Sequence, residues 1–297
     1  MANRSANGLY STDLTYTKRI LLMVCVFVFM MAMATFASLL AGYFADPGTR
    51  AFLLWTATFQ NIIGFAGTAV VCAIFLSKRP LEMLGVNRAG TWLALGGILL
   101  IYALGQPFLN QVIWWNSQLH LPDTLQTVEQ TMRQWEEQAM TQTDTLISGK
   151  SVTTLLLNVL VIGIITGTCE ELVFRGTLQR ILASGPIGSH AAIWITAIIF
   201  SIMHFQFFGF LPRVLLGAFF GYLFYRTGSI WMSAAAHAIN NSMYVIVAWL
   251  INNGVHVGSI DTFGVTHRGF PAVACTSLFL VLFVFIGLRT YLFKTHG

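Results

Sequence analysis

Eight apolar stretches divide this chain, and they limit its possible folds more than any other feature. A hydrocarbon layer about 30 Å thick is crossed by about 20 residues of helix. Inside that layer the backbone must satisfy its own hydrogen bonds, which a helix does within one segment. We therefore predict an all-α polytopic membrane protein of about eight transmembrane helices, near 19–44, 51–77, 91–110, 152–175, 189–208, 210–226, 230–251 and 269–293.

The composition excludes an ordinary soluble domain. Hydrophobic residues make up 56% of the sequence and charged residues 9%, against about 25% charged in an average soluble domain. The first apolar run follows Lys18 and Arg19 and is too long for the core of a signal peptide, so we expect a retained span. Basic residues beside anionic lipid headgroups account for the net charge of +5, and no nucleic-acid partner is expected.

The basic residues also predict an orientation. An even number of spans places both termini on one side of the membrane. Of the 16 Lys and Arg residues, eleven then fall on the side of the termini and five on the opposite side. Because cytoplasmic loops carry the excess of Lys and Arg, we expect both termini in the cytoplasm.

A long polar segment, 111–150, interrupts the apolar pattern. Within 127–140 its apolar residues recur at helix-like spacing among polar ones, at Val128, Met132, Trp135 and Met140. This pattern predicts a helix lying on the outer membrane surface, either as a simple connection or as a lid that grips substrate. Uncharged amides in the first three spans, such as Asn61 and Asn110, are expected to bond between helices.

Ionisable residues inside three apolar stretches mark a candidate site. Glu170 and Glu171 occur with Arg175 near the end of the stretch that starts at 152. Two later stretches each hold a pair four residues apart, Phe200 with His204 and His237 with Asn241. Intramembrane charges cost free energy and by default indicate function. The alternative is a set of satisfied polar groups that bond helix to helix.

Helical spacing suggests roles for these residues. Arg175 lies one turn from Glu171, so the two can form an ion pair, and Glu170 faces elsewhere as the candidate base. If the chain reverses between 184 and 189, Glu170 and His204 are equidistant from that turn and level with each other.

Amide hydrolysis needs an activated water and donors for the developing oxyanion. We assign the first task to Glu170 with His204 and the second to His237 with Asn241. Phe200, Glu171 and Arg175 are expected to support these four residues. The neighbouring Cys169 has no basic residue near it in sequence to activate it as a nucleophile.

The order and spacing of the three motifs resemble the CPBP family of intramembrane proteases, which includes the type II CAAX prenyl proteases and the bacteriocin-related Abi group. The resemblance covers about 150–245. It includes the stretch 217–241, in which Gly221, the segment 227–229 and Trp231 precede His237. It implies eight helices, an intramembrane active-site cavity open to the cytoplasm, and endopeptidase activity. It also implies that Glu170 and His204 activate water while His237 and Asn241 stabilise the oxyanion.

The apolar pattern and the charge distribution predict this domain organisation: 1–18 as a cytoplasmic N-terminal segment, 19–110 as scaffold transmembrane helices 1–3, 111–150 as an external loop with an interfacial amphipathic helix, 151–251 as catalytic helices 4–7, and 252–297 as an external loop with the final span. The expected partners are membrane lipids and a peptide or membrane-protein substrate. No organelle retention signal is present, which favours a bacterial inner membrane.

Two questions stay open at this stage. A metal mechanism would use Glu170, His204 and His237 as zinc ligands, although the chain lacks an HExxH motif; we favour a metal-independent mechanism with no cofactor. Besides the protease, the alternatives are a catalytically silent immunity or binding protein and a transporter. A transporter predicts internal repeats and interrupted helices, which the sequence does not display.

Overall fold

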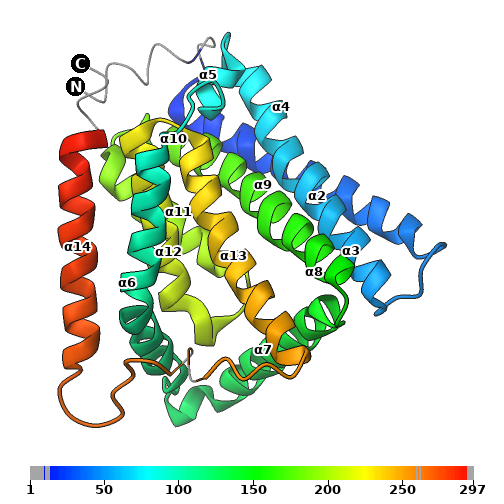
Figure 1. Cartoon of the computed structure of the whole chain (residues 1–297). Helices are drawn as coiled ribbons and strands as arrows, with labels where there is room; N and C mark the ends of the chain where they lie inside the picture. The colour runs from blue at the N-terminus through cyan, green and yellow to red at the C-terminus, as the bar shows by residue number, and fades with distance from the viewer. Residues whose placement is uncertain (1–9, 11–13, 259, 261, 293–297) are drawn as a thin grey trace.

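The computed structural model describes residues 10, 14–258, 260 and 262–292. All regular elements among them are helices, which confirms the predicted all-α class (Figure 1). Six helical segments are long and apolar enough to cross a membrane, and two shorter apolar helices, Gly188–Ile202 and Ala272–Gly287, accompany them. The protein is an integral, polytopic membrane protein, as its composition predicts.

The elements follow one another in this order: α2 (Tyr16–Ala41); α3, η1 and α4 (Arg50–Phe59, Gln60–Ala66, Gly67–Leu76); α5 (Pro80–Leu84); α6 (Trp92–Ser117); η2 (Asp123–Leu125); α7 (Gln126–Ile147); α8, η3, α9, η4 and α10 (Val152–Asn158, Val159–Thr166, Gly167–Glu171, Leu172–Gln179, Arg180–Ala183); α11 (Gly188–Ile202); η5 (Phe207–Gly209); α12 (Phe210–Thr227); α13 (Ile230–Asn252); and α14 (Ala272–Leu292). Segments η1, η3 and η4 are π-helical, whereas η2 and η5 are single 3₁₀ turns.

Local sequence signals explain several helix ends. The side chains of Thr49, Thr91 and Ser151 each accept a hydrogen bond from the backbone N–H three residues later, which starts α3, α6 and α8. Gly228 ends α12 at φ 64°, a left-handed conformation that glycine adopts without steric cost. The chain therefore turns sharply between α12 and α13.

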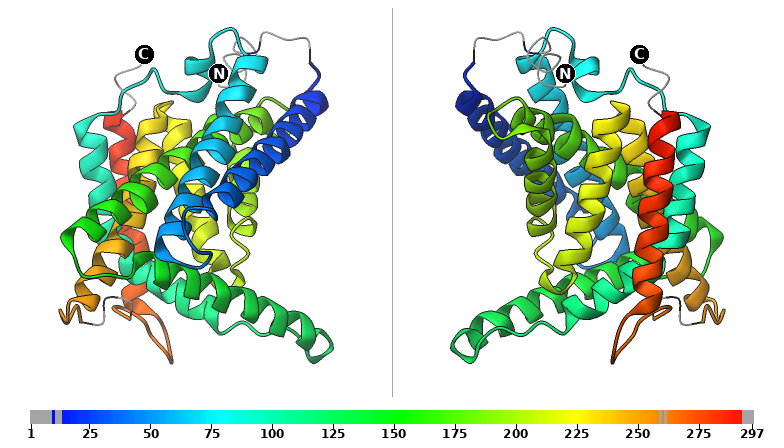
Figure 2. Two further views of the ribbon diagram at one scale, coloured as in Figure 1. Left: turned by 90° about the vertical axis from the view of Figure 1, so that its right-hand side faces the viewer. Right: turned by 90° about the vertical axis from the view of Figure 1, so that its left-hand side faces the viewer.

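The start of α2 and the end of α14 lie at the same end of the bundle (Figure 1; Figure 2), as an even number of spans requires. Along the bundle, α11 packs on α12 and α14 packs on α6. Arg4 and Lys294, which contribute to the charge count, lie outside the described residues, as does most of the predicted 1–18 segment.

The helix α7 runs crosswise over the other end of the bundle (Figure 2). It covers the predicted stretch 127–140 and continues to Ile147. Val128, Trp135 and Met140 are 48%, 46% and 57% exposed, so about half of each of these apolar residues of α7 is left uncovered by the rest of the protein. This is the arrangement expected of a helix at a membrane surface.

Three predicted boundaries are wrong. The predicted span 91–110 continues as α6 to Ser117, which places the boundary between 110 and 111 inside a helix. The helix predicted at 152–175 continues to Ala183, and the one predicted at 189–208 ends at Ile202. Hydropathy reports how long the apolar run is, whereas a helix ends where its backbone hydrogen bonds are redirected.

Polar amides tie the scaffold together, partly as predicted. Asn61 Nδ2 donates to Thr166 Oγ1 at 3.0 Å, which links η1 to η3. Asn110 Nδ2 instead donates to the carbonyls of Ile260 and Phe263, at 2.7 and 3.1 Å, in the loop before α14. The expected helix-to-helix bond is therefore present for Asn61, while Asn110 holds a loop.

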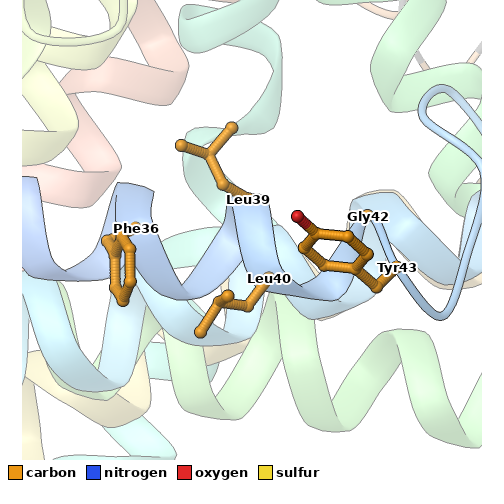
Figure 3. A pocket seen from close by; sticks show the side chains of 5 residues that line it. All are labelled: Phe36, Leu39, Leu40, Gly42 and Tyr43. Carbon is orange, nitrogen blue, oxygen red and sulfur yellow. The ribbon is translucent and has the colours of Figure 1, made fainter.

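A surface hollow occurs at the carboxyl end of α2, far along that helix from its start (Figure 3). Its lining is Phe36, Leu39, Leu40, Gly42 and Tyr43. None of these residues belongs to the predicted site. Because Leu39 and Tyr43 are 67% and 85% exposed, this hollow is part of the apolar outer surface of the protein.

Candidate active site

The two glutamates lie in a helix that departs twice from α-helical geometry. Glu170 and Glu171 end α9, with the π-helical segments η3 before them and η4 after them. Such wide turns occur frequently at functional sites, because they redirect side chains within an otherwise continuous helix. Both carboxylates are buried: Glu170 is 8% exposed and Glu171 is fully buried.

Glu171 is the centre of a buried network. Its Oε1 atom accepts a hydrogen bond from Arg175 Nη1 at 2.8 Å, so the ion pair predicted from the spacing is present. The same oxygen accepts a hydrogen bond from His237 Nδ1 at 2.9 Å. Hydrogen bonds to a charged carboxylate are stronger than those between neutral groups. Glu171 thereby connects α9 to α13.

Arg175 extends this network to α12. Its Nη2 atom donates to the backbone carbonyl of Gly217 at 2.9 Å. The guanidinium carbon lies 4.9 Å from the ring centre of Phe200 and 5.5 Å from that of Phe220, within the range of cation–π attraction. A fully buried arginine thus has a charge partner, a carbonyl acceptor and aromatic faces.

Glu170 faces the other edge of His237. Its Oε2 atom lies 3.7 Å from His237 Nε2, beyond hydrogen-bond distance. That oxygen is buried and makes no hydrogen bond within the part of the chain that the structure describes. An unsatisfied buried carboxylate oxygen is rare in folded proteins and calls for an explanation.

His237 is held in place by packing as well as by Glu171. Its ring stacks on Phe220, with centroids 4.9 Å apart and planes 20° from parallel, and it meets the edge of Phe200 at 5.7 Å. The carboxylate of Glu171 accepts from Nδ1, so Nδ1 carries the proton and Nε2 points at Glu170. The contacts with Phe220 and Phe200 and the hydrogen bond at Nδ1 together fix the orientation of the His237 imidazole.

His204 lies beyond the end of α11, which corrects the prediction that the helix near 189–208 includes it. The helix stops at Ile202, and Phe205 adopts a left-handed backbone with φ 52°. The His204 backbone N–H bonds to Ser201, and the imidazole Nδ1 donates to the Phe200 carbonyl at 2.8 Å. His204 still lies within electrostatic range of Glu170 and His237.

Asn241 fastens α13 to η3. Its Nδ2 atom donates to the carbonyl of Ile162 at 3.1 Å. Glycine makes this approach close, because a Cβ atom at Gly167 would lie 2.9 Å from the backbone nitrogen of Ala238. Asn240, which the sequence did not single out, donates to Asn241 Oδ1 at 3.3 Å.

Two further contributors escaped sequence-based prediction. Gly217 supplies a carbonyl to Arg175, and Phe220 provides the face on which His237 stacks. A phenylalanine in an apolar helix looks like any other core residue, so nothing in the sequence distinguishes Phe220. The i, i+4 interval between Gly217 and Gly221, which accept from Arg175 and Gln179, is recognisable only once the facing helix is known.

The proposed zinc ligands do not form a ready metal site. Within the described ranges, no group of three or more His, Cys, Asp or Glu side chains is arranged to hold a metal ion. The Nδ1 atoms of His204 and His237 are both engaged by protein oxygens, so only their Nε2 atoms could bind a metal ion.

The comparison with known families covers this part of the chain. Residues 152–243 match the family described as Rce1-like, type II CAAX prenyl endopeptidase. The match confirms the predicted resemblance over these residues. No curated protein and no solved structure matches the chain.

The Rce1-like segment, residues 152–243, contains all three motifs, from Glu170 to Asn241. At the level of the family it supports a protease function inside the membrane, acting on a peptide or protein substrate. The other described spans, α2 to α6 and α14, lie outside the segment. The candidate residues from Glu170 to Asn241 therefore all lie within the matched segment.

Proposed function

We propose that this protein is an intramembrane endopeptidase in which Glu170 and His204 activate a water molecule. The observation that carries the proposal is the buried Glu170 carboxylate, with one oxygen free of hydrogen bonds and directed at His237. A carboxylate in that position is suited to accept a proton from water. Glu171 Oε2 also makes no hydrogen bond among the described residues, but the other oxygen of Glu171 accepts from Arg175 and His237, so Glu171 is committed to the buried network and Glu170 is not.

The tautomer of His204 suits a role beside Glu170. Because the Phe200 carbonyl can only accept, Nδ1 of His204 carries the proton and Nε2 keeps its lone pair. That nitrogen can accept a hydrogen bond from the water that attacks the substrate. The water oxygen bonds to the carbonyl carbon while its proton passes to Glu170, which then delivers the proton to the leaving nitrogen as the C–N bond breaks.

His237 is placed to stabilise the oxyanion. Its ring lies between the two carboxylates, with Nδ1 on Glu171 and Nε2 facing Glu170. A proton on Nε2 lets that edge of the ring donate to a developing oxyanion. Asn241 adds a second donor, since only one hydrogen of its amide is needed by the Ile162 carbonyl.

The substrate class follows from the family and stays broad: a peptide or membrane-protein segment, prenylated or not. We further infer that the protein resides in a bacterial inner membrane with both termini in the cytoplasm. The distribution of basic residues supports this orientation. We propose no metal and no other cofactor, and chelation provides the test.

A cleavage assay on the full chain in liposomes tests the proposal. The probes are two quenched-fluorescent peptides that end in a C-a-a-X sequence, one of them farnesylated. Glu170→Gln and His204→Ala are expected to lower the cleavage rate by at least about a hundredfold, the range for loss of a general base. The matched control is Glu82→Gln, an exposed carboxylate of α5 that pairs with Arg79.

Three results would change the conclusion. Wild-type turnover in Glu170→Gln would remove Glu170 as the base. Inhibition by EDTA that added zinc reverses would replace the glutamate mechanism with a metal mechanism. Absence of cleavage of either probe by the wild type, with specific binding retained, would favour the silent immunity or binding protein.

A further inference from the structure

The crosswise helix α7 contacts the turn that carries His204. We propose that Trp135 and Glu136 of α7 are positioning residues, which hold that turn so that the His204 imidazole keeps its hydrogen bond to the Phe200 carbonyl and leaves Nε2 free. The inference rests on the proposed function and deepens it, since it assigns α7 a part in the reaction beyond that of a connection between two spans.

The turn after α11 adopts an unfavourable backbone conformation. Phe205 has φ 52°, and it is the one residue other than glycine with positive φ among those described. A phenylalanine in the left-handed region is strained, so neighbouring contacts must stabilise it. This same turn directs the His204 backbone N–H to Ser201 and leaves the Phe200 carbonyl for the imidazole. The position of His204 therefore depends on Phe205.

Trp135 packs directly on the strained residue. Its ring meets that of Phe205 at 6.1 Å and 88°, an edge-to-face contact, and lies 6.4 Å from the ring of Phe207. Edge-to-face aromatic pairs at this separation are attractive. Trp135 thus contacts a residue on either side of Gln206 and holds the turn from the outside.

Glu136 holds the backbone of the same turn. Its Oε2 atom accepts the N–H of Phe208 at 3.3 Å. The neighbouring turn of α7 contributes as well, because the guanidinium of Arg133 lies 4.1 Å from the ring centre of Phe208. Consecutive side chains of α7 therefore reach successive residues of one short segment.

The remaining contacts of the turn come from α6 and α12. Asn116 donates to the Phe207 carbonyl at 2.9 Å and accepts the Leu211 N–H at 2.8 Å. Arg213 donates to the Gln206 side chain at 2.6 Å and also to its backbone carbonyl. These two residues belong to packed spans, whereas α7 lies across the end of the bundle. Substitutions on α7 therefore change the contacts of the turn without replacing a residue of a membrane span.

The first test compares Glu136→Ala with Glu136→Gln and Glu137→Ala in the full chain. Glu137 is the matched control, because it is the next residue of α7 and its side chain is exposed. We expect Glu136→Ala to lower kcat about tenfold or more with little change in KM, as a displaced catalytic group does. Glu136→Gln keeps an oxygen acceptor for the Phe208 N–H and should recover most of the loss.

The second test asks whether a second substitution restores kcat to Trp135→Ala, which is not expected if Trp135 only anchors α7 to the membrane. Trp135→Ala should lower kcat because Phe205 loses its packing partner. Adding Phe205→Gly to Trp135→Ala should restore kcat at least in part, because glycine adopts φ 52° without strain. If Trp135 only anchors α7 at the membrane surface, the second substitution will restore nothing.

A measurement that does not require activity separates this inference from the proposed function. In the protein labelled with ¹⁵N-histidine, the His204 signal, assigned by its loss in His204→Ala, should show the proton on Nδ1. Glu136→Ala should give a mixture of tautomers, and Glu137→Ala should not. If the wild type cleaves no peptide but this change occurs, the proposed function fails and the positioning role stands. An unchanged His204 signal, or unchanged kcat in an active protein, would overturn the positioning role.

Discussion

His237 Nδ1 lies 2.9 Å from Glu171 Oε1, although the two residues are 66 positions apart. Arg175 donates to the same oxygen. The contact couples the ion pair of α9 and η4 to the histidine of α13, so a change at Arg175 or Glu171 also alters the orientation of His237. The Glu171 carboxylate therefore serves both the stability of the fold, through Arg175, and the proposed reaction, through His237.

Removing Arg175 should destabilise the protein more than it impairs the reaction directly. In Arg175→Ala, Glu171 stays fully buried without its cation, and we expect the free energy of unfolding to fall by about 3–5 kcal/mol. Arg175→Lys keeps the charge beside Glu171, so its loss should be smaller, although its single nitrogen cannot occupy both positions from which Nη1 and Nη2 reach Glu171 and Gly217. Thermal unfolding in detergent measures both, and full stability of Arg175→Ala would contradict the role of the pair.

Phe220 should affect turnover through the ring it supports. In Phe220→Leu, His237 loses a stacked face worth about 0.5–1.5 kcal/mol. We expect kcat to fall between about twofold and tenfold with little change in KM. The control is Phe219→Leu, because the Phe219 ring packs on Tyr102 and Phe285. Equal losses in the two variants would indicate general core damage.

A methyl group at Gly167 should separate the two helices that meet at the site. Its Cβ would lie 2.9 Å from the Ala238 backbone nitrogen and 3.2 Å from the Ala238 Cα, and backbone atoms cannot move aside cheaply. We expect Gly167→Ala to cost about 1–3 kcal/mol of stability and most of the activity. Gly96→Ala is the control, since nothing lies within 4 Å of the added atom. It should be neutral or slightly stabilising.

The start of α7 should respond to acid. Glu129 accepts a hydrogen bond from the Leu121 N–H at 2.7 Å and further hydrogen bonds from Arg133 and His120. These bonds lower the pKa of Glu129 from 4.5 to about 2, and the bond from Leu121 has the largest effect. A depressed carboxyl pKa contributes stability above pH 4.5 that is lost as the pH falls toward 2. The Leu121 amide proton shift, followed by NMR, should titrate with a midpoint near pH 2. In Glu129→Gln that titration should disappear; a midpoint near 4.5 in the wild type would contradict the hydrogen bonds.

The sequence alone determined the features that depend on local spacing or on the solvent. Apolar runs long enough to cross hydrocarbon require helices, because the backbone finds no other partners there. The pairing of Glu171 with Arg175 was predictable because residues four apart share a helix face, and it is present at 2.8 Å. The reversal between α10 and α11 was predictable from its Gly and Pro residues.

Only the tertiary structure decided which edge of each histidine is free. His237 shares Glu171 with Arg175 because α9 and α13 pack closely at Gly167, a contact between distant segments. His204 lies outside its predicted helix, in a turn where Phe205 is left-handed and contacts Trp135 of α7. Periodicity describes neighbours along one helix, whereas these contacts depend on how separate helices meet, and that is settled by packing of the whole bundle.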